Sequence, residues 1–295
     1  MKIDAIDVEF KGKSDLIAVF LIQDGNHRAL VETGPESCFP ALEKGLKKHG
    51  VSIGDIDSVF LTHIHFDHAG AAWKFAEAGA TIYVHPEGYR HMNDPARLVK
   101  SARRIYLDQM DTLWGKMEAI NEDKLVTVED QQVCKAGNLE MKAHFTPGHA
   151  KHHIAWQCGE HVFTGDVTGC RILSGPVVLP TPPPDFDKEL WLDSIRKIRE
   201  MKPKTLWLTH FGEVTDSEKH LDETEKSLDL ICHLTEISFK TNDGKVDEQV
   251  LVNYYRAFTL AYGLDENSLD KYSNIAPHWM NSQGLSRYWS KQEQS

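Results

Sequence analysis

The chain has 295 residues, a formal net charge of −11 and no compositionally biased segment, so it is long enough for one large domain or a domain with an appendage. Binding to a nucleic-acid backbone needs clustered Lys and Arg, so this charge argues against a nucleic-acid partner. No apolar run approaches the roughly 20 residues that span a bilayer, and the opening MKIDAIDVEF lacks the apolar core of a secretory signal. We expect a cytoplasmic protein without a membrane partner.

The five cysteines are odd in number, widely spaced and without a CxxC pair. This usage argues against a disulfide framework and favours a reducing compartment. The 16 histidines are the unusual feature of the composition, because histidine is the commonest metal ligand among the side chains.

The first half of the chain reads as strands alternating with helices. β-branched and apolar runs predict strands, and amphipathic runs that end at glycine predict helices. The strands are expected at 3–10, 16–23, 27–34, 58–63 and 81–85, the helices at 39–50 and 69–79, and a helical insertion at about 86–121.

Strands resume in the second half, at 124–128, 138–145, 152–158, 161–166 and 205–210, with a proline-rich loop at 174–187 and a helix at 188–201. After Glu213 the pattern is helical, broken near 241–245, 263–268 and 275–278. This order predicts an α+β protein, a four-layer αβ/βα sandwich whose sheets are mostly antiparallel. We expect a catalytic domain over 1–215 and a helical C-terminal extension over 216–295.

The loop after the strand at 58–63 is rich in metal-type ligands. The stretch LTHIHFDHAG places His63, His65, Asp67 and His68 within six positions. Residues at i, i+2 and i+4 point the same way from extended chain, which suits the first three. Burying such groups without partners would cost several kcal/mol, so the loop indicates a shared metal site.

Three more strand ends carry the same residue types. His149 follows the strand at 138–145, Asp166 ends the strand at 161–166, and His210 ends the strand at 205–210. A sheet scaffold would bring such strand ends to one rim.

The ordered set THIHFDH, TPGH, TGD and LTH resembles the metallo-β-lactamase-fold superfamily over roughly residues 1–215, in particular its hydroxyacylglutathione-hydrolase-like and thioesterase-like members. The resemblance implies the metallo-β-lactamase sandwich and two bound metal ions. It assigns one metal to His63, His65 and His149. It assigns the second to Asp67, His68 and His210, with Asp166 bridging the two.

Two divalent ions that share a water lower its pKa toward ~7 and generate a nucleophile, and the second ion stabilises charge in the transition state. We therefore expect a dinuclear hydrolase in which a metal-bridging hydroxide cleaves a small ester or thioester. The nitrogen and oxygen ligands favour zinc, with iron or manganese as alternatives. Asp67 is expected to act first as a ligand and also as the catalytic residue that orients the attacking water.

Several alternatives stay open. The same site suits a lactonase or a phosphodiesterase, a mononuclear iron persulfide dioxygenase, or a metal-loaded ligand-binding or signalling protein. Lactonases of this superfamily usually have a tyrosine near the metals, for which Tyr254 and Tyr255 are distant candidates. The partner is expected to be a small-molecule substrate, and a homodimer is left open.

Other residues receive two interpretations each. The histidines outside the ligand motifs are interpreted as ordinary surface or core residues, with His152 or His153 as candidates to support the ligands: His85, His91, His144, His152, His153, His161, His220 and His278. Glu32 stands where the family more often has Asp in support of the metals. The proline-rich loop is either a pocket wall or a rigid connector. Five aromatic residues pack the helices or line an apolar pocket: Tyr106, Trp114, Trp279, Tyr288 and Trp289.

Overall fold

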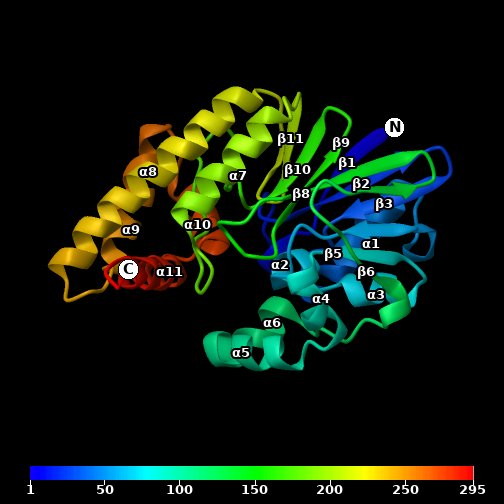
Figure 1. The fold of residues 1–295 in the computed structure, drawn as a ribbon, viewed down its shortest axis with the longest axis horizontal. Helices are drawn as coiled ribbons and strands as arrows, with labels where there is room; N and C mark the ends of the chain where they lie inside the picture. The colour runs from blue at the N-terminus through cyan, green and yellow to red at the C-terminus, as the bar shows by residue number, and fades with distance from the viewer. Residues whose placement is uncertain (295) are drawn as a thin grey trace.

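The structure, a computed structural model, describes residues 1–294. It contains two six-stranded sheets, with orders β1-β2-β3-β4-β5-β6 and β12-β11-β10-β9-β8-β7. The sheets pack face to face with helices on their outer sides, and the C-terminal helices project beyond the second sheet (Figure 1). This is the predicted four-layer α+β sandwich.

The strands are short and the helices span a wide range of lengths. The strands are β1 Lys2–Asp7, β2 Ala18–Asp24, β3 His27–Val31, β4 Ser58–Phe60, β5 Thr81–Val84, β6 Leu125–Thr127, β7 Val133–Ala136, β8 Leu139–Phe145, β9 Ile154–Cys158, β10 His161–Gly165, β11 Thr205–Leu208 and β12 Gly212–Val214. The helices are α1 Phe39–Lys48, α2 Phe66–Ala69, α3 Ala72–Glu77, α4 Pro86–Asn93, α5 Ala96–Tyr106, α6 Met110–Trp114, α7 Lys188–Glu200, α8 Ser217–Thr241, α9 Glu248–Ala261, α10 Glu266–Ile275 and α11 His278–Gln292.

Within residues 1–294, six of the ten strand pairs are antiparallel, as the sequence predicts, and four are parallel. In the first sheet β3, β4, β5 and β6 pair parallel to one another, and in the second sheet β10 and β11 are parallel. Each of the crossovers β3–β4, β4–β5 and β10–β11 contains a helix (α1, α3 and α7), which is what a parallel pair requires. The expected mostly antiparallel pairing is therefore confirmed, and the parallel pairs are the part of the topology that the sequence did not predict.

Alternation along the strands separates the hydrophobic interior into layers. On β2, Val19 and Leu21 belong to the cluster that packs under α1 and α3, whereas Phe20 and Ile22 belong to the cluster between the sheets. Trp156 of β9 lies in the same middle cluster and packs edge-on against Phe60 of β4. The two sheets are thus held face to face by large side chains.

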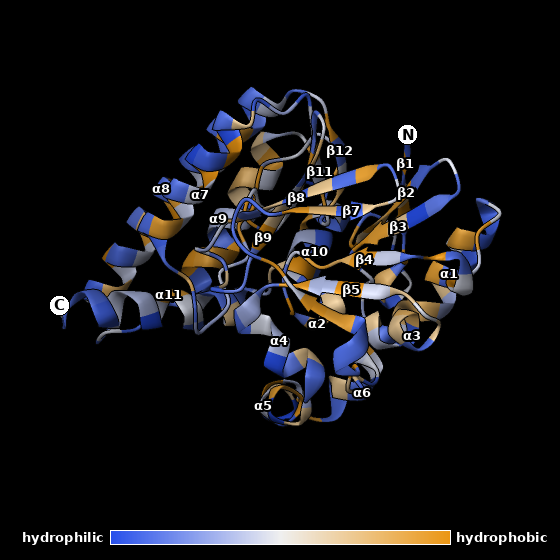
Figure 2. Cartoon of the chain, turned by 45° about the vertical axis from the view of Figure 1, so that its right-hand side comes forward, coloured by the Kyte–Doolittle hydropathy of each residue, from blue (hydrophilic) through white to orange (hydrophobic). Residues whose placement is uncertain are grey.

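The C-terminal helices share a hydrophobic cluster with the second sheet. Tyr255 of α9, Tyr272 of α10 and Leu285 of α11 are fully buried in the cluster that contains Leu206 and Leu208 of β11. Along α8, hydrophilic residues are interleaved with hydrophobic ones (Figure 2), as expected for a helix with one buried face. The C-terminal helices therefore pack on the core of the sandwich.

Side-chain caps mark the start of three of the C-terminal helices, α8, α9 and α10. An aspartate accepts a hydrogen bond from the first turn of each helix at Asp216 (α8), Asp247 (α9) and Asp265 (α10), a strong helix-start signal. Two other expectations need correction. The last α-helix of the insertion ends at Trp114, and the strands β7 and β12 were not expected. Within residues 1–294, no helix combines the length and hydropathy of a membrane span.

The hydroxyl of Tyr272 ties α10 to the loop after β10. It accepts a hydrogen bond from the Ile172 backbone N–H (3.0 Å) and donates one to the Pro176 carbonyl (2.6 Å). Tyr272→Phe leaves both buried groups unpaired, so the free energy of unfolding should fall by about 1–3 kcal/mol. Tyr262→Phe is the control, because Tyr262 is 39% exposed, and should change it by less than about 0.5 kcal/mol. Urea unfolding is the measurement. Equal unfolding midpoints for Tyr272→Phe and the wild type would contradict the predicted loss of stability.

Candidate metal centre

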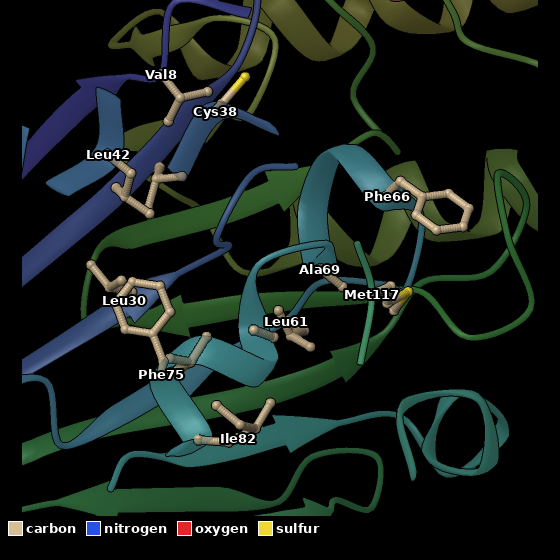
Figure 3. Packing of buried hydrophobic residues seen from close by; sticks show 14 of the residues in the cluster. Val8, Leu30, Cys38, Leu42, Leu61, Phe66, Ala69, Phe75, Ile82 and Met117 are labelled. Carbon is tan, nitrogen blue, oxygen red and sulfur yellow. The ribbon is translucent and has the colours of Figure 1, made fainter. Parts of the chain in front are cut away.

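Loops at the ends of four strands carry all seven residues predicted as metal ligands. His63 and His65 follow β4, and Asp67 and His68 lie on the short helix α2. Phe66 and Ala69 of α2, with Leu61 before it, pack into the cluster under the first sheet (Figure 3). The apolar residues of the loop therefore anchor it while its ligand-type residues face away.

The other three residues come from the second sheet. His149 follows β8, Asp166 follows β10 directly, and His210 follows β11. The structure brings all seven side chains together at one rim of the sandwich.

Three imidazoles form a first group. His65 Nδ1 lies 3.0 Å from His63 Nε2 and 3.0 Å from His149 Nε2. One nitrogen of each ring lies within 4.8 Å of the others. Three neutral imidazole nitrogens at this separation can bind one divalent metal ion.

A second group, in which one potential ligand atom of each side chain also lies within 4.8 Å of the others, consists of Asp67, His68 and His210. Asp67 Oδ2 lies 3.6 Å from His68 Nε2 and 3.5 Å from His210 Nε2. Glu32 forms a third candidate group with His63 and His68, but its oxygens already accept other hydrogen bonds.

The carboxylate of Asp166 lies between the two groups. Its Oδ2 is 3.4 Å from His149 Nε2, and its Oδ1 is 3.3 Å from His68 Nε2 and 3.5 Å from His210 Nε2. His68 Nε2 and Asp166 Oδ1 are buried and have no hydrogen-bond partner of suitable geometry. Such orphaned atoms are rare in proteins. Their presence at the point where the two groups meet fits a pair of metal ions.

Hydrogen bonds at the opposite ring nitrogens orient four of the histidines. His149 Nδ1 donates to the Pro180 carbonyl (2.9 Å), and His210 Nδ1 donates to the Leu16 carbonyl (2.7 Å). His68 Nδ1 donates to Glu32 Oε1 (2.9 Å), and His63 Nδ1 contacts Thr62 Oγ1 (3.0 Å). Each bond directs an Nε2 lone pair into the site, as partners of metal-bound histidines do.

Glu32 connects both sheets to the centre. Besides His68, it accepts hydrogen bonds from the Thr62 backbone N–H (3.2 Å), the Thr62 hydroxyl and the Thr209 hydroxyl (3.4 Å). It is fully buried and has a left-handed backbone, φ 68°, a strained conformation that is characteristic of functional sites. The sequence signalled its role through the position in VETG. The threonines that precede His63 and His210 were not recognised in advance.

His153 was interpreted as ordinary, with a ligand-supporting role as the alternative. The structure buries it fully beside the centre. Its Nε2 accepts a hydrogen bond from the Asp166 backbone N–H (3.3 Å), and its Nδ1 bonds the Thr146 hydroxyl (2.8 Å). His152 contacts the rings of His63 and His65.

Burial and neighbouring charge set the protonation of the cluster. Burial, followed by the charge of His149, lowers the pKa of His65 to about 3. For His68, burial also acts to lower the pKa, but the carboxylates of Asp166 and Asp67 outweigh it and raise the pKa well above 6.5. Burial acts to raise the pKa of Asp67, but the charges of His68 and His210 hold it at about 2. The centre thus holds two ionised carboxylates.

Two glycines of the motifs allow close packing at the centre. A Cβ on Gly148 would overlap the Trp191 Cα, and a Cβ on Gly165 would lie 2.5 Å from Thr62 Oγ1. Both residues have positive φ, where side chains are strained. Glycine is therefore required just before His149 and Asp166.

The centre opens into a cavity of about 680 Å³. Helices α4–α6 and the C-terminal helices contribute to its walls, as do the prolines of the proline-rich loop. Among its lining residues are Phe10, Phe66, Leu98, Ile105, Tyr106, Trp114, Pro180, Pro182, Pro183, Pro184, Ile275, Trp279 and Met280.

The cavity lining shows which of the aromatic residues face the cavity and which pack the helices. Tyr106, Trp114 and Trp279 line the cavity, whereas Tyr288 and Trp289 pack in the cluster on the second sheet. Tyr254 and Tyr255 are buried in that cluster and do not line the cavity. They are therefore excluded as tyrosines of the metal centre.

Comparison with known proteins matches this architecture. The model of the metallo-beta-lactamase superfamily matches residues 14–210. The metallo-beta-lactamase fold-containing protein ST1585 of Sulfurisphaera tokodaii is 29% identical over 57% of this chain. The match spans 66% of that relative's length. The hydroxyacylglutathione hydrolase of Crocosphaera subtropica is 25% identical over 65% of this chain and 63% of its own length.

Solved structures extend the likeness to the C-terminal helices. The crystal structure of TTHA1429 from Thermus thermophilus, a metallo-beta-lactamase family protein, superposes with a TM-score of 0.69 at 18% identity, covering 99% of this chain and 94% of that chain. The structure of ST1585 has a TM-score of 0.63 at 24% identity and covers 76% and 84%. With the family model spanning both sheets from before β2 to His210, the chain belongs to the metallo-β-lactamase superfamily.

Proposed function

We propose that this protein is a metal-dependent hydrolase that holds two divalent metal ions, preferentially zinc, and cleaves an ester or thioester. The observation that carries the proposal is the position of Asp166 between two groups of three ligand-type side chains. His63, His65 and His149 would hold one ion. Asp67, His68 and His210 would hold the other, and Asp166 would contact both.

Bound metal ions would supply Lewis acidity, lowering the pKa of water near ~7 and stabilising charge on the substrate. The residues of the chain supply the rest. Buried neutral imidazoles and two ionised carboxylates provide compensating ligands. Asp67 is 20% exposed at its side chain and lines the cavity, so it is the ligand that can also orient an attacking water or accept its proton.

The ester or thioester class is supported by relatives and by the cavity. One relative is named hydroxyacylglutathione hydrolase. Another, BaeB of Bacillus velezensis, is named a probable polyketide biosynthesis zinc-dependent hydrolase and is 27% identical over 43% of this chain. A cavity of about 680 Å³ lies within the usual range for sites that enclose drug-sized ligands. The substrate should therefore be larger than a short acyl ester.

The complete second group favours two metals over a single-iron oxygenase, which would leave Asp67, His68 and His210 without a purpose. The residues that line the cavity suggest separate roles for the two parts of the chain. Residues 1–215 would form the catalytic domain, and the extension over 216–295 would complete the substrate pocket through α10 and α11, which contribute Ile275 and Trp279.

Metal-loaded protein should turn over members of a panel of thioesters, esters, lactones and phosphodiesters, with thioesters or esters fastest. His210→Ala should lower the metal content from two ions per chain to about one and reduce kcat/KM at least a hundredfold. His161→Ala, outside the centre, is the matched control. Metal analysis and initial rates are the measurements. A fully loaded enzyme with no activity on any ester or thioester would refute the proposed function.

Metal binding should release protons at pH 7. Burial alone would lower the pKa of His68 and His210, but the nearby carboxylates raise both above 6.5. In the metal-free chain both rings therefore stay protonated above pH 6.5, and a metal must displace those protons. Apparent zinc affinity should rise with pH until the pH exceeds the raised pKa values of His68 and His210. Calorimetry in two buffers of different ionisation enthalpy measures this, and identical heats in both buffers would contradict it.

A further inference from the structure

Two arginines on the insertion helices face the cavity without a partner. Arg90 of α4 and Arg97 of α5 both line the cavity. Within residues 1–294, neither guanidinium forms an ion pair or a side-chain hydrogen bond. His91 also lines the cavity, and burial followed by the charges of Arg90 and Arg97 lowers its pKa. The three side chains form one patch on the cavity wall, the insertion patch, whose positive charge comes from the two arginines.

The insertion patch contrasts with the charge of the chain. Residues 86–106 contain five Lys or Arg against two Asp or Glu, in a protein of net charge −11. The other cations at the cavity are occupied, since Lys151 lies 3.8 Å from Asp185 and Lys11 donates to Asn274 Oδ1. Glu87 is the one carboxylate that α4 and α5 contribute to the lining. Both arginines are exposed and their side chains form no described polar contact with the fold, so their guanidinium groups are available to a ligand in the cavity.

We propose that the insertion patch binds an anionic group, a carboxylate or a phosphate, on the part of the substrate remote from the cleaved bond. The inference rests on the proposed hydrolase function and narrows its substrate to an anionic ester or thioester. Guanidinium groups match both anions in geometry. Because the patch and the metal ligands line one cavity with apolar walls, a single ligand can reach both. An apolar segment would join its two ends.

The test compares thioesters of one acyl group on three thiols: uncharged N-acetylcysteamine, carboxylate-bearing 3-mercaptopropionate and phosphate-bearing phosphopantetheine. The wild type should prefer one or both charged thiols in kcat/KM. Arg90→Glu combined with Arg97→Glu should reduce that preference about tenfold, and the preference should weaken with added salt. Which charged thiol is preferred distinguishes carboxylate from phosphate.

Arg103→Glu combined with Arg104→Glu is the matched control, with the same charge change on α5 outside the cavity lining. It should leave the preference intact. An equal loss in both double variants, or no preference in the wild type, would overturn the inference. Binding of the uncleavable thioether analogues keeps the test separate from turnover. Equal affinities for all three analogues would overturn the patch, whereas failure of turnover alone would refute only the proposed function.

A second observation connects the C-terminal extension to a metal ligand. Asn281 of α11 is 1% exposed. Its Oδ1 accepts from the Thr181 backbone N–H (2.9 Å), and its Nδ2 donates to the Leu179 carbonyl (3.1 Å). These two bonds bracket Pro180, whose carbonyl accepts from His149 Nδ1 (2.9 Å).

The geometry points to Asn281 as a positioning residue for His149. It holds the backbone of 179–181 at the place where the Pro180 carbonyl orients the imidazole. Helix α11 lies directly against this backbone, since a Cβ on Gly284 would overlap the Thr181 carbonyl oxygen. The extension therefore acts on the centre through hydrogen bonds as well as through the pocket wall.

Asn281→Ala should weaken zinc binding about tenfold in competition with a chromophoric chelator, and Asn281→Asp, which keeps the acceptor for Thr181, should recover part of the loss. Leu285→Ala is the control, because Leu285 is fully buried on the same helix and should lower stability through lost packing. Zinc affinity should stay at the wild-type value in that variant. Wild-type affinity in Asn281→Ala, or an equal loss in Leu285→Ala, would overturn the assignment.

Discussion

The burial of the Asp166 carboxylate is the constraint on which the rest of the structure depends. The residue is 2% exposed, and a buried charge costs several kcal/mol unless it is paired. Three imidazole nitrogens lie 3.3–3.5 Å from its two oxygens. These imidazoles come from α2 and from the loops after β8 and β11. The fold must therefore align strand ends of both sheets before the charge is compensated.

Hydrogen bonds around the predicted ligand residues secure this alignment. The backbone carbonyls of Leu16 and Pro180 each fix one imidazole, and Glu32 joins α2 to the strand ends of both sheets through Thr62 and Thr209. Because each bond occupies the ring nitrogen that faces away, the other nitrogen is left for a metal. The support is distributed over the chain, so no single loop could form the centre alone.

The insertion and the C-terminal helices add a cavity to this common scaffold. Apolar side chains of α5, α6 and α11 enclose the space in front of the ligands. The extension is anchored in the cluster on the second sheet by residues such as Tyr255 and Leu285. Under the proposed function, specificity would depend on segments outside the histidine and aspartate motifs, in agreement with the general rule that function is added to a fold by its loops and additions.

The sequence by itself determined most of the element order, the sandwich class, the breaks in the tail and the seven residues that meet at the rim, because residue spacing and strand periodicity are local properties. It did not determine that β3–β6 pair parallel, that Glu32 and His153 hydrogen-bond to the predicted ligand residues, or that Tyr254 and Tyr255 do not line the cavity. Those facts depend on which segments pack together. Arg90 and Arg97 likewise became informative only once the fold placed them on the cavity wall, since contact between distant segments is decided by the packing of the whole core.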